Sequence, residues 1–242
     1  MGKLNVVGIG PGSKEHMTFK AFDVLNSSDV IVGYTGYVKL LPLELSHIET
    51  VSTGMGSEEE RCRMALSLAT ENKNVSLICS GDSVVYGMAG LVYELTKEYP
   101  DVEVNVIPGV TAAVSGSALI GAGVGNDFAV ISLSNYLTAK DDTYKRIRAC
   151  AEADLVMAFY NPNSHKRPEC LKEACEYLLK LVDKNRVCAV AKNIGRDDEC
   201  FDVMTLKELA DADVDMFSTV FIGSSMTENI NGKFVTRRGY KV

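Results

Sequence analysis

The sequence predicts an α/β protein with mostly parallel strands. Short apolar runs rich in β-branched residues alternate with helix-like stretches along nearly the whole chain, and this alternation is typical of strand–helix–strand units. A glycine-rich run, residues 8–12, follows the first strand directly. Four further loops of small or polar residues follow later strands. Ligands of open α/β sheets bind at the carboxyl ends of strands, so these loops indicate a ligand site.

The expected strands share a run of apolar residues bounded by turn-forming ones. They cover residues 4–9, 29–33, 75–79, 103–107, 129–133, 154–160, 187–191 and 217–222. One helix is expected to begin at Ser57, where Glu60 three residues later completes a capping-box pattern. The other clear helices are expected over residues 88–99, 111–120 and 167–182, the last with Pro168 in its first turn.

The number of strands permits two domains, which we expect over residues 1–115 and 116–242. No Ser/Pro-rich linker separates the two halves, so the domains are expected to abut. A cleft between two domains is a natural ligand site.

Composition excludes several classes of protein. A net charge of −7 argues against a nucleic-acid partner, because phosphate contacts need a basic face. No run approaches 18 apolar residues and the N-terminus has no signal-peptide core, so we expect no membrane span and a cytoplasmic location. The seven cysteines form no C-x-x-C pair and only three histidines are present. We therefore expect reduced thiols and no metal site.

The glycine run does not match a dinucleotide fingerprint. That motif would place a third glycine where the sequence has Ser13. Pro11 also removes a backbone N–H that a pyrophosphate would need. Asp29 precedes its strand rather than closing it. A ligand loop of another kind and a purely structural turn both stay open.

The other loops each have a structural alternative. Asp82, in residues 80–88, can meet a ligand or act as a turn or helix-capping aspartate. The small residues at 107–113 allow close approach of a ligand or of a neighbouring helix. Residues 159–167 and 191–196 are ligand loops or ordinary polar turns, and His165 alone is more typical of a surface histidine.

Taken together, the loops resemble those of the tetrapyrrole methyltransferases of cobalamin biosynthesis, which use S-adenosylmethionine (SAM). Residues 8–12, followed by Met17 and Thr18, look like the opening motif of that family. Residues 81–87 look like its G-D-P-x-x-Y-G loop with Ser83 in place of proline, and residues 108–112 look like its P-G-x-[ST]-[AS] segment.

Finer motifs resemble one group within that family, the precorrin-3B C-17-methyltransferases, whose anaerobic version acts on cobalt-factor III. Two departures concern the loop expected beside the substrate: Asn135 stands where an acid is usual, and residues 137–140 lack the usual Pro-Trp. The matching segments are residues 131–134, residues 160–164 with Arg167, residues 193–196 with Glu199, and residues 221–225.

The resemblance implies two αβα domains with SAM in the cleft between them, a homodimer, and methylation of a tetrapyrrole at C-17 with ring contraction. Carried over motif by motif, it implies cofactor contacts at Pro11, Gly81, Asp82, Val85, Thr111, Ala112, Tyr160 and Ile194. Methyl transfer from a neutral sulfur leaving group needs little proton transfer, so we expect no strong catalytic triad. Orientation of two bound reactants can lower the barrier by about 7–11 kcal/mol.

The catalytic group for ring contraction stays open, with Ser134, Asn161 and His165 as candidates beside Tyr160 and Ser164. The substrate carries many carboxylates, which arginine and lysine bind. Candidate cations at strand ends are Lys14, Lys140, Lys166, Arg167, Lys192 and Arg196. The alternative functions are methylation of another corrin carbon, a diphthine-synthase-like protein methyltransferase, and a SAM-binding module without turnover.

Overall fold

The computed structural model describes residues 2–164 and 166–241. The chain forms two compact units, Met1–Thr111 (unit 1) and Ala112–Val242 (unit 2). Each unit has its own sheet and its own hydrophobic core. The sequence-based boundary at residue 115 falls inside helix α5 (Ala112–Ile120), which belongs entirely to unit 2.

Unit 1 contains a five-stranded sheet in the order β3-β2-β4-β1-β5, and every neighbouring pair is parallel. Helices lie in the connections between successive strands, because a parallel pair needs a crossover connection. The strands are β1 (Lys3–Gly8), β2 (Val30–Tyr34), β3 (Glu49–Thr53), β4 (Asn74–Cys79) and β5 (Glu103–Ile107).

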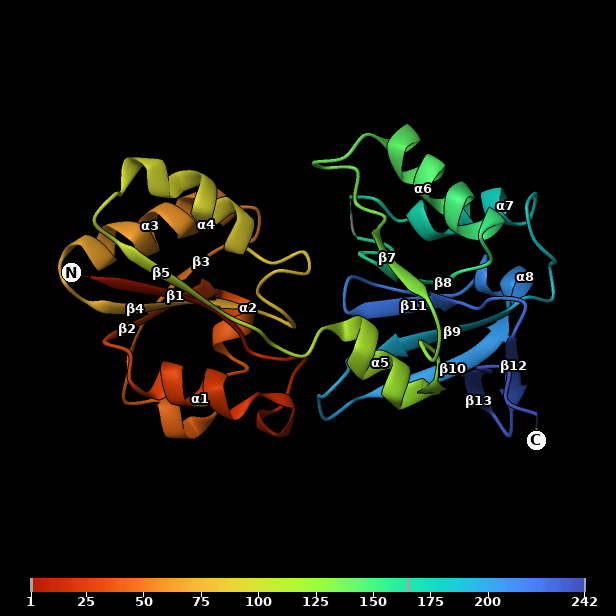
Figure 1. Cartoon of the computed structure of the whole chain (residues 1–242), viewed down its shortest axis with the longest axis horizontal. Helices are drawn as coiled ribbons and strands as arrows, with labels where there is room; N and C mark the ends of the chain where they lie inside the picture. Colours follow the sequence, from red (N-terminus) through yellow and green to blue (C-terminus); the bar gives the residue numbers. More distant parts are fainter. Residues whose placement is uncertain (1, 165, 242) are drawn as a thin grey trace. The chain divides into compact units, whose positions relative to one another are not determined.

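Helices cover both faces of this sheet, so unit 1 is an αβα layer structure (Figure 1). On one face α3 (Glu58–Thr70) and α4 (Ala89–Leu95) pack on the even-numbered side chains of β1, Leu4 and Val6. On the other face α1 (Phe19–Asn26) packs on Val7. The short helices are α2 (Thr35–Val38), η1 (Lys14–His16), η2 (Leu43–Leu45) and η3 (Thr96–Glu98).

Unit 2 contains a second five-stranded sheet in the order β10-β9-β11-β8-β7. Only β7 and β8 pair in parallel, and the other three pairings are antiparallel. The strands are β7 (Phe128–Ser132), β8 (Val156–Tyr160), β9 (Val187–Lys192), β10 (Cys200–Thr205) and β11 (Ser218–Ile222). A small sheet joins β6 (Gly121–Ala122), β12 (Thr227–Ile230) and β13 (Lys233–Thr236).

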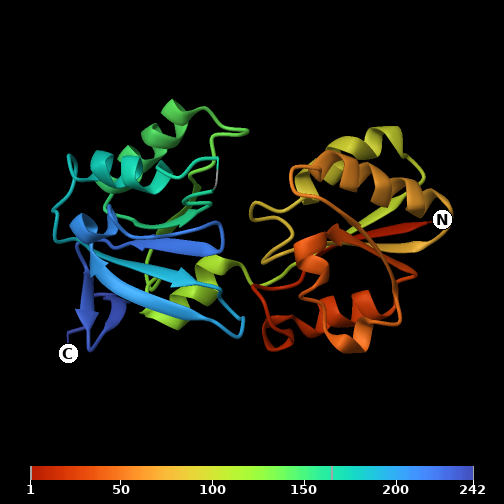
Figure 2. The same ribbon diagram turned by 180° about the vertical axis from the view of Figure 1, so that it is seen from behind.

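Unit 2 is layered in the same way. Helices α6 (Lys140–Glu152), α7 (Cys170–Leu178) and α8 (Leu206–Leu209) cover one face, where Phe159 is fully buried. Helix α5 and β13 cover the other face around Phe221 and Phe234 (Figures 1 and 2). Among the described helices, none combines the length and apolar character needed to cross a membrane.

The α/β class and all eight expected strands are confirmed, and the structure differs from expectation in the pairing of unit 2 and in the cap at Ser57. The expected, mostly parallel pairing holds in unit 1, whereas most pairings in the large sheet of unit 2 are antiparallel and the unexpected strand β10 forms a hairpin with β9. Ser57 makes no side-chain cap on α3, since its ψ of 39° departs from the extended conformation of a capping residue. A complete capping box is found instead at Thr205 and Glu208, before α8.

Candidate cofactor and substrate site

Three loops of unit 1 meet where the neighbouring strands β4, β1 and β5 end at the same edge of the sheet. The first two loops pair through their backbones. Gly10 N donates to Gly81 O at 3.0 Å, and Gly81 N donates to Gly10 O at 2.7 Å. Both glycines have positive φ, 79° and 69°, a region that glycine enters without steric cost.

The glycines at this edge allow the loops to pack backbone against backbone. A Cβ added at Gly8 would lie 2.6 Å from Gly109 N, and one added at Gly109 would lie 2.1 Å from Gly81 O. Neither neighbouring atom is on a flexible side chain, so neither can move away cheaply. The close approach that we expected toward a bound ligand is therefore, at Gly8 and Gly109, an approach between loops.

The carboxylate of Asp82 ties two of these loops together. Its Oδ1 accepts hydrogen bonds from Val84 N and Val85 N, both at 2.8 Å, and its Oδ2 accepts one from Gly109 N at 2.8 Å. Burial by itself would raise the pKa of this carboxyl, but the backbone N–H groups of Gly109, Val85, Val84 and Ser83 outweigh it and lower the pKa. Asp82 is ionised at neutral pH and holds the loop surface in place.

Ser83, which departs from the family motif, has a structural role. Its side chain is fully buried and Oγ donates a hydrogen bond to Ile107 O at 2.8 Å. Proline has no hydroxyl and could not make this contact. The serine therefore links the loop after β4 to the end of β5, and the Asp82 contact to Gly109 joins the same two segments.

The residues at this edge fit SAM in their chemistry. Pro11, Gly81 and Asp82 are buried, whereas Val85 and Thr111 are half-buried and can face a ligand. The negative charge of Asp82 is fully engaged by backbone donors. Unit 1 thus presents at this edge a neutral surface of backbone groups, on which the side chains of Val85 and Thr111 are partly exposed.

The predicted cofactor residues of unit 2 gather around the first half of α5. Tyr160, the last residue of β8, accepts a hydrogen bond on its hydroxyl oxygen from Ala113 N at 2.6 Å. That bond satisfies a backbone donor in the first turn of α5. The buried Ile194 packs on the same helix, with its Cδ1 2.9 Å from a Cβ built on Gly116. Ala112 begins the helix and is half-buried beside them.

Two of the three catalytic candidates meet at the ends of β7 and β8. Asn161, at a positive φ of 52°, donates from Nδ2 to Ser132 Oγ at 3.0 Å. The backbone N of Ser134 donates to the same oxygen at 3.2 Å. The third candidate, His165, lies outside the described residues. The contacts of Ser134 and Asn161 join two adjacent strand ends and involve amide and hydroxyl groups.

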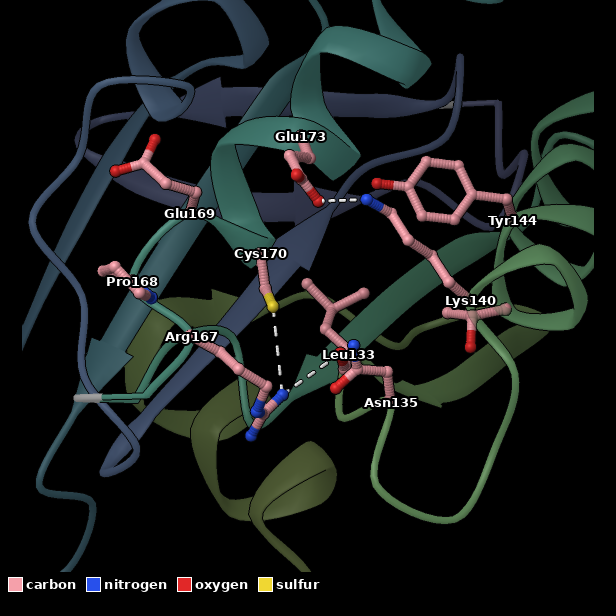
Figure 3. A pocket seen from close by; sticks show the side chains of 10 residues that line it. Leu133, Asn135, Lys140, Tyr144, Arg167, Pro168, Glu169, Cys170 and Glu173 are labelled. Carbon is pink, nitrogen blue, oxygen red and sulfur yellow. Dashed lines mark hydrogen bonds and ion pairs between the residues drawn. The ribbon is translucent and has the colours of Figure 1, made fainter.

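A cavity of about 210 Å³ lies between the first turns of α6 and α7 and the loop after β7 (Figure 3). Its cations are Arg167 and Lys140, and Lys140 Nζ pairs with Glu173 Oε2 at 2.6 Å. The residues that line it are Leu133, Asn135, Lys140, Thr143, Tyr144, Arg167, Pro168, Glu169, Cys170 and Glu173.

The remaining candidate cations are dispersed. Lys14 pairs with Glu44 on the surface of unit 1. In unit 2, Arg196 stacks on the ring of Phe217, with its Cζ 4.7 Å from the ring centroid. Lys166 is exposed and Lys192 is half-buried. The structure thus brings two of the six candidates, Lys140 and Arg167, into one cavity.

Sequence reasoning missed Arg61, which is only 2% exposed. Its Nε donates to Oγ1 of Thr53, the last residue of β3, at 2.9 Å, and its Nη2 donates to Gly54 O at 2.7 Å. The signal was available in the helical spacing: Arg61, Ala65 and Ala69 are four residues apart and all lie on the buried face of α3.

A family model described as Tetrapyrrole (Corrin/Porphyrin) Methylases matches residues 3–210. The chain belongs to this family. A protein of Salmonella typhimurium named a probable cobalt-factor III C(17)-methyltransferase is 42% identical, and the match covers 98% of this chain and 99% of that one. A Methanocaldococcus jannaschii protein of the same name is 39% identical over 98% and 97% of the two chains.

Another relative of this methylase, the cobalt-factor III methyltransferase of Priestia megaterium, is 42% identical, and the chain spans only 45% of its length. Among solved structures, the methyltransferase CobJ matches with a TM-score of 0.90 at 30% identity, over 98% of this chain and all of that one. A uroporphyrin-III C-methyltransferase from Thermus thermophilus, solved with S-adenosylhomocysteine, shares the fold with a TM-score of 0.72 at 23% identity.

These comparisons confirm the predicted family, its fold and a methyltransferase activity. The likeness to diphthine synthase, with a TM-score of 0.66 at 18% identity, shows a shared fold alone.

Proposed function

We propose that this methylase transfers a methyl group from SAM to C-17 of cobalt-factor III in cobalamin biosynthesis. The observation that carries the proposal is the full-length match, at 42% and 39% identity, to two proteins named for that reaction. The matched region includes every loop described above, from the glycine run to residues 193–196. Precorrin-3B is the corresponding substrate without cobalt and is the alternative acceptor to test.

SAM supplies a methyl group bound to a positively charged sulfur. In unit 1, we assign its binding to the half-buried Val85 and Thr111 and to the backbone around Pro11 and Gly81, with Asp82 as a positioning residue. In unit 2, we assign it to Ala112, Tyr160 and the backbone near Ile194. The Asp82 and Tyr160 contacts support this assignment, because each fixes the backbone of a predicted binding loop or helix start.

The chemistry of the reaction matches the residues present. The sulfur leaves as a neutral thioether, so no acid has to protonate it. The chain's contribution is to hold two reactants in line, which can lower the barrier by about 7–11 kcal/mol. Rigid loops held by backbone contacts, such as the Gly10–Gly81 pairing and the Asp82–Gly109 bond, suit that task.

Ring contraction accompanying the methylation is a further part of the proposal. The hydroxyl of Ser134 and the amide of Asn161, which lie together beside Ser132, can hydrogen-bond a ring oxygen of the substrate. A contracted product from wild-type protein, and an uncontracted methylated product from Asn161→Ala, would support this role. Wild-type product that always keeps the uncontracted ring would remove it.

We also propose a homodimer in a reducing, cytoplasmic compartment. The seven cysteines are all free in the structure, which suits a compartment that keeps thiols reduced. Phe19 and Leu43 are 91% and 87% exposed, and exposed apolar side chains of this size are candidates for burial between subunits. Light scattering on the purified protein distinguishes a dimer from a monomer.

The decisive experiment is incubation of the purified protein with SAM and cobalt-factor III under anaerobic conditions, followed by mass and absorbance analysis. We expect a gain of one methyl group, placed at C-17 by NMR of the product. A parallel incubation with precorrin-3B ranks the two acceptors. Methylation at another ring carbon would overturn the C-17 assignment, and SAM binding without transfer to either tetrapyrrole would favour a binding module.

A further inference from the structure

We propose that the cavity between α6 and α7 binds one carboxylate arm of the tetrapyrrole, and that Arg167 is the residue that recognises it. The inference rests on the proposed function, because it takes the substrate to be a tetrapyrrole with carboxylate arms. It adds a specific subsite in unit 2, a ligand class for that subsite, and a residue whose removal affects the substrate and not SAM.

Arg167 has a charge that its surroundings leave uncompensated. Its guanidinium is half-buried and makes two long contacts, from Nη1 to Leu133 O at 3.4 Å and to Cys170 Sγ at 3.8 Å. Within residues 2–164 and 166–241, no carboxylate lies within ion-pairing distance of it. Arginine presents its N–H groups as a planar fork that matches a carboxylate with two parallel hydrogen bonds.

The acidic residues around the cavity are engaged elsewhere or turned away. Glu173 pairs with Lys140, the other cation of the cavity. Figure 3 shows the carboxylate of Glu169 directed away from the guanidinium of Arg167. Lys140 is itself held by Glu173, so the guanidinium of Arg167 is the cation that stays available to an incoming anion.

The helices around the cavity favour the same sign of charge. Lys140 is the first residue of α6 and Cys170 is the first residue of α7, and both line the cavity. The N-terminus of a helix carries a partial positive charge. Two such ends and one arginine therefore face a common space, and a carboxylate is stabilised there.

The size of the cavity indicates which part of the substrate enters. Pockets that enclose a whole drug-sized ligand measure roughly 300–1,000 Å³, whereas this cavity measures about 210 Å³. A carboxylate arm fits and the macrocycle stays outside. The loop between β7 and α6, which lines the cavity at Asn135, also carries Tyr136 and Leu137, which are 80% and 92% exposed; exposed side chains of this kind can pack on the face of a flat ring.

The test measures binding of cobalt-factor III to the full chain by absorbance titration, with S-adenosylhomocysteine present to prevent turnover. The variants are Arg167→Met, which removes the charge, and Arg167→Lys, which keeps the charge and loses the fork. Lys172→Met is the matched control, because Lys172 is an exposed cation of α7, shortly after Arg167 in the sequence, and does not line the cavity.

We expect Arg167→Met to raise the dissociation constant for cobalt-factor III by about 10- to 100-fold, the range for loss of a hydrogen-bonded charge pair. Arg167→Lys is expected between the wild type and Arg167→Met, and Lys172→Met within about two-fold of the wild type. The dependence of binding on salt is expected to be shallower in Arg167→Met, since one ionic contact is lost. Affinity for S-adenosylhomocysteine, by calorimetry, is expected to be unchanged.

Binding by Arg167→Met within two-fold of the wild type, with the same salt dependence, would overturn the proposal. So would an equal loss of affinity for S-adenosylhomocysteine, which would indicate a general structural role. If Arg167→Met does not fold, Arg167→Lys is the deciding variant. Wild-type affinity of Arg167→Lys for cobalt-factor III would overturn the proposed two-bond contact between arginine and carboxylate. Wild-type protein that binds no tetrapyrrole would overturn the proposed function and this subsite together. The wild-type titration is done first, so this outcome is distinguished from a loss of binding in the variants alone.

Discussion

Replacement of Asp82 tests whether the site is held together by one buried carboxylate. In Asp82→Asn, the oxygen can still accept from Val84 N and Val85 N, but the amide NH₂ then faces Gly109 N–H, and two donors oppose each other. The lost bond is charge-assisted, and such bonds contribute about 1.5–3 kcal/mol. We expect Asp82→Asn to lower the free energy of unfolding by about 2–3 kcal/mol and Asp82→Ala, which loses all three acceptor contacts, by about 3–5 kcal/mol.

The same carboxylate predicts a pH dependence. Its pKa in the folded protein lies below its ordinary value of 3.8, so its contribution to stability is fully present above that ordinary value. The contribution is lost as pH falls through the lower, folded pKa. The difference between wild type and Asp82→Asn is therefore expected to be constant from pH 7 to about pH 5 and to shrink below about pH 4.

Urea unfolding followed by circular dichroism, at a series of pH values, measures both effects. SAM affinity by calorimetry is expected to fall in both variants, because the loop surface loses its support. Ser67→Ala, on the exposed part of α3, is a control that leaves the strand-end loops untouched. The reasoning is refuted if Asp82→Asn unfolds at the wild-type urea concentration, or if its destabilisation is as large at pH 3 as at pH 7.

Three other predictions use the same structure. Gly109→Ala is expected to destabilise the protein by about 1–3 kcal/mol in thermal unfolding, because its Cβ would lie 2.1 Å from a backbone oxygen; an unchanged melting temperature would contradict the loop packing. Tyr160→Phe is expected to cost about 1 kcal/mol and to weaken SAM binding, since Ala113 N loses its acceptor; a variant with wild-type stability and SAM affinity would remove Tyr160 from both roles. In thiol labelling at pH 8 mapped by mass spectrometry, the exposed Cys200 is expected to react first. Burial raises the pKa of Cys79 to about 11, so this thiol is expected to stay unreactive until the protein unfolds. Early labelling of Cys79 would contradict this prediction.

Most of unit 1 could be predicted from its sequence, because a parallel sheet is buried on both faces and its strands are continuous apolar runs. Strand β3, residues 49–53, was missed for the complementary reason. It lies at the edge of the sheet, its side chains are exposed or half-buried, and its sequence is Glu-Thr-Val-Ser-Thr. An edge strand of this kind forms because it pairs with its neighbour, and its own residues are not a continuous apolar run. The local sequence pattern therefore gives little indication of it.

Unit 2 was harder to predict because strand direction is a long-range property. Strands β8, β9 and β11 were all expected, yet no local pattern distinguishes a strand that runs parallel to its neighbour from one that runs antiparallel. The unexpected β10 reverses the chain after residues 193–199 and makes most of the sheet antiparallel. Ser57 shows the same limit at short range, because its dihedral angles, and not its residue type, prevented the cap.

The sequence by itself determined the class of fold, the family and the loops expected to bind ligands. Short motifs at strand ends consist of consecutive residues, so they can be recognised without the structure. Only the tertiary structure decided what those loop residues do. It showed that Gly8 and Gly109 allow contacts between loops, that the carboxylate of Asp82 accepts from three backbone donors, and that Ser83 bonds to the end of β5. It also placed Arg167 in a cavity with no carboxylate partner among the described residues. These roles depend on which segments distant in the sequence become neighbours, and packing of the whole chain decides that.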